Sequence, residues 1–213
     1  MSSTCSFINT KTKFGWDTKE NENPLVVMLR PMILNMMGKS DDKAVINEAK
    51  RRFQCHLNGD LIDPNIREAV YAICSRYGDE STQEELRKLY KAADMTEEKV
   101  RLLRAMGQSV DPNIIEKTLQ FIFESDDVRM QDSPLGLVGC TSSRIGRDIA
   151  WKFLQNDWLK LAERFGEKSR FLIRFCEVNL IEEKLISVKI YSVENLNFYI
   201  NHEAFVEINW NSQ

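Results

Sequence analysis

The histidines are the first residues to test for catalytic chemistry, because zinc hydrolases hold their metal with imidazoles. A zincin site needs two histidines one helical turn apart and a glutamate that activates water, in the pattern His-Glu-x-x-His. The 213-residue chain has two histidines, His56 and His202. His202-Glu203 begins like this pattern, but Val206 stands where the second imidazole is required. We therefore predict no catalytic residue, no metal site and no cofactor for this chain alone.

Nucleophilic and phosphate-binding motifs are also missing from the sequence. It has neither a Gly-x-Ser-x-Gly elbow nor a Gly-x-x-x-x-Gly-Lys loop. The five cysteines are scattered, and none forms Cys-x-x-Cys, which is typical of reduced thiols in a reducing compartment. The carboxylate pairs Asp41-Asp42 and Asp126-Asp127 are interpreted as helix-start or loop residues, where the helix dipole or solvent accommodates them.

One polar set is a candidate peptide-binding site: Arg144, Arg147 and Lys152, at the start of a predicted helix. Cations at a helix N-terminus oppose the helix dipole. An anionic ligand, such as a peptide carboxylate, would compensate for that placement. The alternative is that all three side chains point into solvent.

Helices must position these residues, because helical periodicity dominates from about residue 24 to residue 180. The sequence Asp-Pro-Asn-Ile occurs twice, at 63–66 and at 111–114. Aspartate is a good N-cap and proline fits the first helical position, so each copy predicts a helix start. A start signal that recurs at this interval indicates a stack of helix pairs.

Apolar stripes at helical spacing predict which faces of these helices are buried. The two Asp-Pro helices carry such stripes at Ile66, Ala69, Val70, Ile73 and Tyr77, and at Ile115, Leu119, Ile122 and Phe123. An earlier stripe consists of Leu25, Leu29, Met32, Ile33 and Met36. The methionines Met28, Met32, Met36 and Met37 are interpreted as core residues rather than as an adaptable binding groove.

Several boundaries are also predicted from local signals. Ser81 with Glu84, and Thr82 with Glu85, have the spacing of capping boxes. Residues 126–143 contain a proline and glycines and are predicted to form a long loop, followed by one helix over residues 144–165. The last stretch predicts an irregular or short β-like tail.

Composition restricts the partners of the chain. Its 43% apolar and 29% charged residues are those of a soluble globular protein. The formal charge of −3 and the pI near 5.6 give no reason to expect nucleic acid or an anionic membrane. The cluster Lys50-Arg51-Arg52 is interpreted as a solvated helix face. No apolar run could span a bilayer and no secretory signal is recognised, so we predict a cytoplasmic protein without nucleic-acid or membrane partners.

A series of short segments, taken in order, resembles a known family. The segments are Gly15-Trp16-Asp17-Thr18-Lys19-Glu20-Asn21-Glu22, Leu29-Arg30, Gly38, Glu48-Ala49-Lys50-Arg51-Arg52-Phe53, Ala93-Asp94-Met95-Thr96-Glu97-Glu98-Lys99 and Ala150-Trp151-Lys152-Phe153-Leu154-Gln155-Asn156-Asp157-Trp158. Together they resemble the C-terminal helical domain, called endoplasmic-reticulum-aminopeptidase-like, of puromycin-sensitive aminopeptidase and related zinc aminopeptidases. The resemblance covers about residues 13–173.

This resemblance implies an all-α, armadillo- or HEAT-like solenoid of antiparallel helix pairs. In the full-length enzymes such a domain closes over a zinc catalytic domain and contacts peptides, and the zinc site lies upstream. We therefore expect an isolated or truncated domain without activity of its own, with peptides or an aminopeptidase catalytic domain as partners. The expected domains are a disordered segment at 1–12, the helical domain at 13–180 and a divergent tail at 181–213. The alternatives are a stand-alone helical-repeat adaptor that binds another protein, and a fragment of a longer active enzyme.

Overall fold

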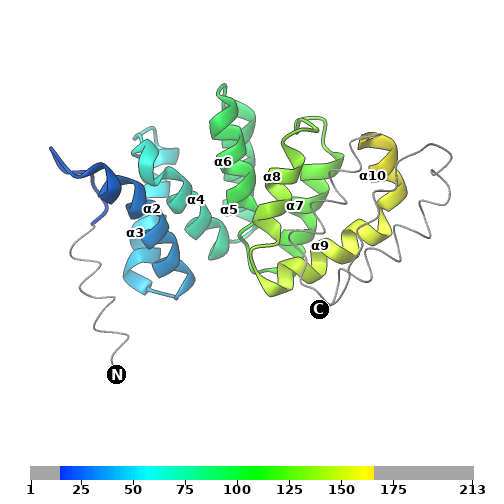
Figure 1. Cartoon of the computed structure of the whole chain (residues 1–213), viewed down its shortest axis with the longest axis horizontal. Helices are drawn as coiled ribbons and strands as arrows, with labels where there is room; N and C mark the ends of the chain where they lie inside the picture. Colours follow the sequence, from blue (N-terminus) through cyan, green and yellow to red (C-terminus); the bar gives the residue numbers. More distant parts are fainter. Residues whose placement is uncertain (1–14, 166–213) are drawn as a thin grey trace, which may run out of the picture. The chain divides into compact units, whose positions relative to one another are not determined.

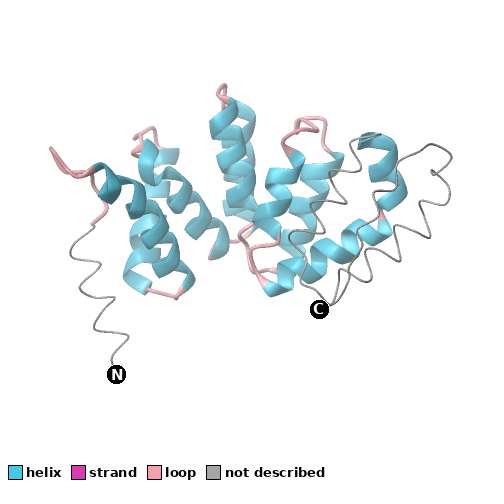
Figure 2. Cartoon of the chain, viewed as in Figure 1, coloured by secondary structure: helices cyan, strands magenta, loops and turns pink. Residues whose placement is uncertain are grey.

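The computed structural model describes residues 15–165, which form helices joined by loops, without a strand in that range (Figures 1 and 2). The helices are α2 (Pro24–Lys39), α3 (Lys43–Leu57), α4 (Pro64–Arg76), α5 (Glu80–Ala92), α6 (Thr96–Met106), α7 (Pro112–Glu124), α8 (Ser133–Cys140), α9 (Arg144–Asn156) and α10 (Trp158–Phe165). The all-α prediction is confirmed for these residues. The predicted disordered segment at 1–12 and tail at 181–213 lie outside them.

Contacts divide the chain into two compact units, Met1–Leu161 and Ala162–Gln213, and the packing described here is within the first. Helices α2 and α3 both pack against α4, and α6 packs against α4, α5 and α8. Helix α7 packs against α8 and α9. None of the helices within residues 15–165 combines the length and the apolar character needed to cross a bilayer.

Both predicted Asp-Pro helix starts are confirmed. The Asp63 carboxylate accepts a hydrogen bond from the amide of Asn65 at 2.9 Å, and Asp111 accepts one from Asn113 at 2.8 Å. Each aspartate is the N-cap of its helix, and the following proline lies in the first turn. The predicted stripes are buried except at Tyr77, which is half-buried at the C-cap of α4. The other eight members are at most 1% exposed: Ile66, Ala69, Val70, Ile73, Ile115, Leu119, Ile122 and Phe123.

Most of the apolar stripe predicted to be buried on α2 is exposed instead. The exposed fractions of Leu25, Leu29, Met32 and Met36 are 65%, 43%, 61% and 58%, and Ile33 is half-buried. Met28, outside that stripe, is 70% exposed. Of the four methionines interpreted as core residues, only Met37 is buried. The prediction was therefore wrong for this helix.

The opposite face of α2 is buried because two residues fit the core only there. Arg30 is completely buried, and its guanidinium forms an ion pair with Glu22 at 2.5 Å. A Cβ atom at Gly38 would lie 2.6 Å from Cγ1 of Ile73, so this position lets α2 approach α4 closely. Since α2 is apolar on both faces, periodicity does not indicate which face packs inward.

Residues 126–143 contain helix α8, although a loop was predicted for the whole segment. The glycines of α8 allow close packing rather than turns. A Cβ atom at Gly139 would overlap the carbonyl oxygen of Arg104 on α6, and one at Gly136 would lie 2.7 Å from a side-chain atom of Ile122 on α7. Pro134 lies in the first helical turn, where it needs no donor. Glycine and proline were thus misinterpreted as helix breakers.

Helix α5 begins earlier than the predicted capping boxes. Its N-cap is Asp79, whose Oδ1 accepts hydrogen bonds from the amide of Thr82 at 3.0 Å and from the Thr82 hydroxyl at 3.1 Å. These hydrogen bonds, the one from the backbone amide first, lower the pKa of Asp79. Ser81 and Thr82 therefore lie inside the first turn, and the capping-box prediction was wrong.

The single helix predicted over residues 144–165 is broken at Asp157. This residue separates α9 from α10 and has φ −107° and ψ 13°. Its carboxylate accepts a hydrogen bond from the ammonium group of Lys160 at 2.9 Å. The apolar periodicity continues across the break, so the stripe alone did not show it.

The ion pairs of Glu48 on α3 predict an acid-dependent loss of stability. Arg51 and Arg52 both donate hydrogen bonds to its carboxylate. They lower the pKa of Glu48 from 4.5 to about 2, the Arg51 bond having the larger effect. Because the pKa is lower in the folded chain, the stabilisation is complete above pH 4.5 and is lost as the pH falls toward 2.

Between pH 4.5 and pH 2, we expect the free energy of unfolding to fall less for a Glu48→Gln variant than for the unmodified chain. Urea titrations at a series of pH values measure the difference. Glu116→Gln, at an exposed position on α7, is the matched control. It should leave the change of the free energy of unfolding with pH as it is in the unmodified chain. Equal slopes for the Glu48→Gln variant and the unmodified chain would contradict the expectation.

Candidate functional site

The three candidate cations lie on α9 but differ in their surroundings. Arg144 is exposed at the first residue of the helix, and Lys152 is exposed two turns later. Arg147 is half-buried, and its guanidinium donates a hydrogen bond to the carbonyl oxygen of Thr141 at 3.3 Å. Thr141 is the C-cap of α8, so Arg147 compensates the negative end of that helix. This structural partner of Arg147 was missed by the sequence analysis.

The spacing of the cations around α9 limits what they can bind together. At about 100° per residue, Arg144 lies ~60° from Arg147 and ~80° from Lys152 around the helix axis. The N-terminus of α9 is already capped, because the Ser143 hydroxyl accepts a hydrogen bond from the amide of Gly146 at 3.0 Å. The amide of Gly146 is therefore not available to an anion, whereas the side chains of Arg144 and Lys152 are exposed.

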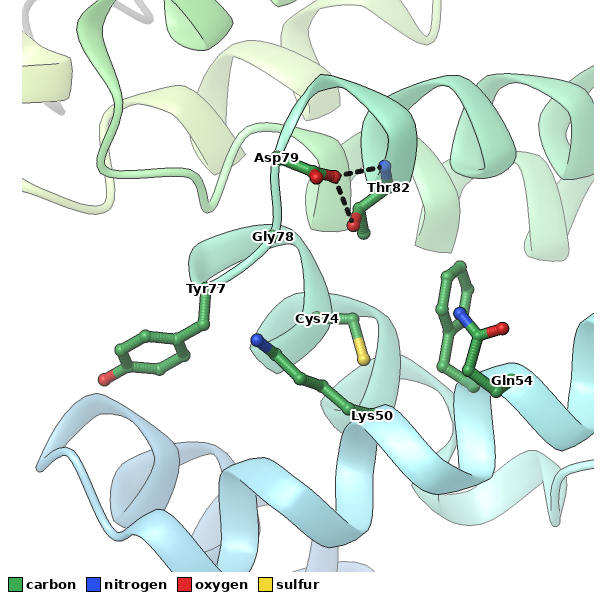
Figure 3. A pocket seen from close by; sticks show the side chains of 8 residues that line it. Lys50, Gln54, Cys74, Tyr77, Gly78, Asp79 and Thr82 are labelled. Atoms are coloured by element: carbon green, nitrogen blue, oxygen red, sulfur yellow. Dashed lines mark hydrogen bonds between the residues drawn. The ribbon is translucent and has the colours of Figure 1, made fainter.

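A second candidate site is a pocket of about 400 Å³ between α3 and the junction of α4 with α5 (Figure 3). It is lined by Lys50, Phe53, Gln54, Cys74, Tyr77, Gly78, Asp79 and Thr82. Lys50 extends from α3 toward the C-terminal end of α4 (Figure 3), where a cation interacts favourably with the helix dipole. Lys50 and Arg51 are exposed, as predicted for a solvated face, whereas Arg52 is half-buried and lies over the Trp16 ring at 5.2 Å.

The pocket has no activated nucleophile. Burial raises the pKa of the Cys74 thiol to about 12, so that thiol is neutral near pH 7. The Tyr77 hydroxyl donates a hydrogen bond to the Gly38 carbonyl oxygen at 2.6 Å and is not available to a ligand. The ammonium group of Lys50, the amide of Gln54 and the carboxylate of Asp79 remain, and these groups can bind a polar ligand. Such a set supports binding rather than bond cleavage.

A histidine, a tyrosine and a glutamate form one hydrogen-bonded cluster between α3, α4 and α6. The Tyr71 hydroxyl lies 2.9 Å from Nε2 of His56 and donates to Glu98 at 3.0 Å. Nδ1 of His56 lies 3.0 Å from the carbonyl oxygen of Asp60, and Glu98 pairs with Arg67 at 3.2 Å. Burial, and then the charge of Glu98, raise the pKa of Tyr71. The tyrosine is thus a neutral donor that links three helices.

The described residues do not fit a zinc site. The one histidine between residues 15 and 165 is His56, and both of its ring nitrogens lie within hydrogen-bonding distance of protein atoms. Over the same range, no group of three or more histidine, cysteine, aspartate or glutamate side chains could hold a metal ion. The fragment His202-Glu203 lies outside the described residues.

Sequence comparison relates the chain to a family of known proteins. Residues 7–179 match the family described as the ERAP1-like C-terminal domain. The chain is 38% identical over 167 residues to Aminopeptidase M1 of Arabidopsis thaliana and 33% identical over 160 residues to Aminopeptidase M1-A of Oryza sativa subsp. japonica. It is 23% identical over 171 residues to puromycin-sensitive aminopeptidase of Caenorhabditis elegans.

These alignments cover most of this chain and a small part of each relative. They include 76%, 72% and 80% of the chain, but 18% of the length of each of the three relatives. The matched region is the C-terminal domain, and the resemblance noted in the sequence is confirmed. Because the family match extends over residues 7–179, the chain belongs to the family of ERAP1-like C-terminal domains.

Proposed function

We propose that this chain serves as the C-terminal helical domain of a zinc aminopeptidase of the puromycin-sensitive type, closing the active-site chamber and contacting peptide substrate. The observation that carries the proposal is the family match over residues 7–179. In the full enzyme, zinc and the groups that act on the substrate amide belong to a catalytic domain. This chain contributes a binding surface and has no catalytic activity alone.

An armadillo- or HEAT-like stack is the arrangement that we propose for the helix pairs. The packing of α3 on α4, α5 on α6 and α7 on α8 supports it. The two Asp-Pro starts do not mark these pairs, because they open α4 and α7, which are three helices apart. Such stacks present extended surfaces for binding.

Arg144 and Lys152 are the residues that we propose to contact the carboxylate end of a peptide. Both side chains are exposed on α9, and a cation paired with a carboxylate is a strong hydrogen-bonding combination. Arg147 is assigned to positioning, because it already caps α8 through the Thr141 carbonyl group.

Peptide binding by the purified full chain tests this proposal. A fluorescent peptide with a free C-terminal carboxylate should bind more tightly than the same peptide with a C-terminal amide, measured by anisotropy. Arg144→Ala and Lys152→Ala should each weaken carboxylate binding about 2–5-fold, as expected for exposed ion pairs. Lys88→Ala, at an exposed lysine of α5, is the control and should leave the affinity unchanged.

Two results would contradict the proposal. Equal affinity for the carboxylate and amide peptides would remove the assigned role of the α9 cations. Release of amino acids from aminoacyl reporters by the purified chain would show that it carries catalytic groups of its own.

A further inference from the structure

His56 shares one chain of hydrogen bonds with Tyr71 and Glu98, and the donors in this chain can be counted. Nδ1 of His56 lies 3.0 Å from the carbonyl oxygen of Asp60, which only accepts, so Nδ1 must carry a proton for that bond. Nε2 lies 2.9 Å from the Tyr71 hydroxyl, and the same hydroxyl lies 3.0 Å from Oε1 of Glu98. A hydroxyl group has one proton to donate. Tyr71 can therefore donate to His56 or to Glu98, but not to both.

All of these hydrogen bonds form together only when the imidazole carries a proton on both nitrogens. Nδ1 then donates to Asp60, Nε2 donates to Tyr71, and Tyr71 donates to Glu98. A neutral imidazole cannot support the whole chain. If its proton were on Nε2, the lone pair of Nδ1 would face the carbonyl oxygen of Asp60, which is repulsive. With the proton on Nδ1 instead, Nε2 accepts from Tyr71, and Glu98 loses the bond from the hydroxyl.

The surroundings of the chain allow the Tyr71 hydroxyl to turn between its two partners. Burial, and then the charge of Glu98, raise the pKa of Tyr71, so the phenol keeps its proton near neutral pH. Glu98 forms ion pairs with Arg67 at 3.2 Å and with Arg101. Its carboxylate therefore stays paired when the hydroxyl turns away. His56 is half-buried, so water can supply or remove a proton at the ring.

The remaining charges around His56 belong to α3 and to the segments beside it. The groups are Arg52, Glu48 and Cys55 on α3, Asp60 in the loop after it, and Asp17 before α2. Arg52 pairs with both Glu48 and Asp17. Within the described residues, the ring nitrogens have hydrogen-bonding partners in Asp60 and Tyr71. A proton on Nε2 therefore acts on Glu98 through Tyr71.

We propose that His56, Tyr71 and Glu98 form a proton-dependent switch, in which the charge of the imidazole sets the direction of the Tyr71 hydrogen bond. With both ring nitrogens protonated, the chain of bonds runs from α3 through α4 to α6. When Nε2 releases its proton to water, the hydroxyl turns to His56 and its bond to Glu98 is lost. Histidine side chains commonly exchange this proton between about pH 5 and pH 8. The switch works in the same way whatever the function of the whole chain.

NMR spectra of the full chain, recorded from about pH 5 to pH 8, test the switch. The nitrogen chemical shifts of the His56 ring should show both nitrogens protonated at the acid end and only Nδ1 protonated at the alkaline end. The side-chain carboxyl carbon of Glu98 should shift together with the imidazole, because it loses the bond from Tyr71. Glu97, exposed on the same helix, is the control, and its carboxyl carbon should not follow the imidazole.

Two variants separate the switch from a direct effect of the imidazole charge on Glu98. Tyr71→Phe keeps the ring that contacts the edge of Phe53 but removes the hydroxyl, so Glu98 should lose most of its response while His56 still titrates. His56→Asn keeps an amide that can donate to the Asp60 carbonyl group but has no proton to exchange. In that variant the Glu98 carbon should not respond over the same interval. Circular dichroism verifies that both variants are folded.

The proposal fails if, in the unmodified chain, the Glu98 carbon does not move while His56 titrates. It also fails if the neutral ring of His56 carries its proton on Nε2, because Tyr71 would then have no reason to turn. A Tyr71→Phe variant that keeps the full response of Glu98 would show that the imidazole charge acts on the carboxylate directly, without the hydroxyl.

Discussion

Replacing Phe123 with alanine is expected to lower the free energy of unfolding by about 3–5 kcal/mol. The Phe123 side chain is 1% exposed, and its ring stacks on that of Phe153 with 5.8 Å between the centroids. Phe123 lies on α7 and Phe153 on α9. The substitution removes apolar surface from the core and leaves a cavity that the surrounding helices cannot fill. Urea denaturation followed by circular dichroism measures the loss.

Phe121→Ala on the same helix is the control for the size of the side chain. Phe121 is half-buried and contacts the edge of Tyr90 with 5.7 Å between ring centroids. Its replacement should cost clearly less, because part of the ring is already in contact with water. Because Phe153 belongs to α9, the Phe123 variant should also weaken peptide binding at Arg144 and Lys152 if those residues bind as proposed. Equal losses of stability for the two phenylalanine variants would contradict the assigned burial.

Local sequence signals predicted the fold where one residue type determines the backbone. Asp63 and Asp111 were identified as helix starts because their carboxylates bond to amides two residues later, and no distant contact is needed for that. The stripe of α7 was also correct, since that helix has one apolar face. The stripe of α4 is buried too, but α4 is buried on every side between Ala69 and Ser75, which the stripe alone did not indicate. Sequence alone was sufficient for the helix starts because an N-cap is a local property.

Prediction failed where contacts between distant residues decide the outcome. The face of α2 that is buried depends on Arg30, whose partner Glu22 lies before the helix, and on Gly38, which contacts Ile73 of α4. Neither contact is visible in the periodicity of α2. The pocket was missed for a similar reason, because Lys50 of α3 meets the end of α4 only after the chain has folded.

The peptide-binding role of the three cations on α9 stays a prediction, and the structure gives only their surroundings. Arg144 and Lys152 are exposed cations, as their positions near a helix start suggested. Arg147 has the same residue type and a similar spacing, yet it bonds to the carbonyl group of Thr141. That partner is the C-cap of α8, a helix in the segment that was predicted to form a loop. An incorrect element boundary thus concealed the structural role of a candidate residue.

Gly139→Ala tests the close packing of α8 on α6, with two opposing effects. Alanine is favoured over glycine inside a helix by about 1 kcal/mol. The new Cβ atom, however, would overlap the carbonyl oxygen of Arg104, a backbone atom that cannot rotate away. Overpacking of this kind costs about 1–3 kcal/mol, and more where the neighbour is rigid. We expect the packing effect to dominate, with a net loss of about 2 kcal/mol in the free energy of unfolding.

Gly136→Ala on the same helix separates the two effects. There the nearest neighbour is the side chain of Ile122, at 2.7 Å from the added Cβ atom, and a side chain can shift more easily than a backbone. Its loss of stability should therefore be smaller than that of Gly139→Ala. Urea denaturation of both variants gives the comparison. A gain of stability in Gly139→Ala would mean that helix propensity alone governs this position, and that α8 and α6 are not in backbone contact there.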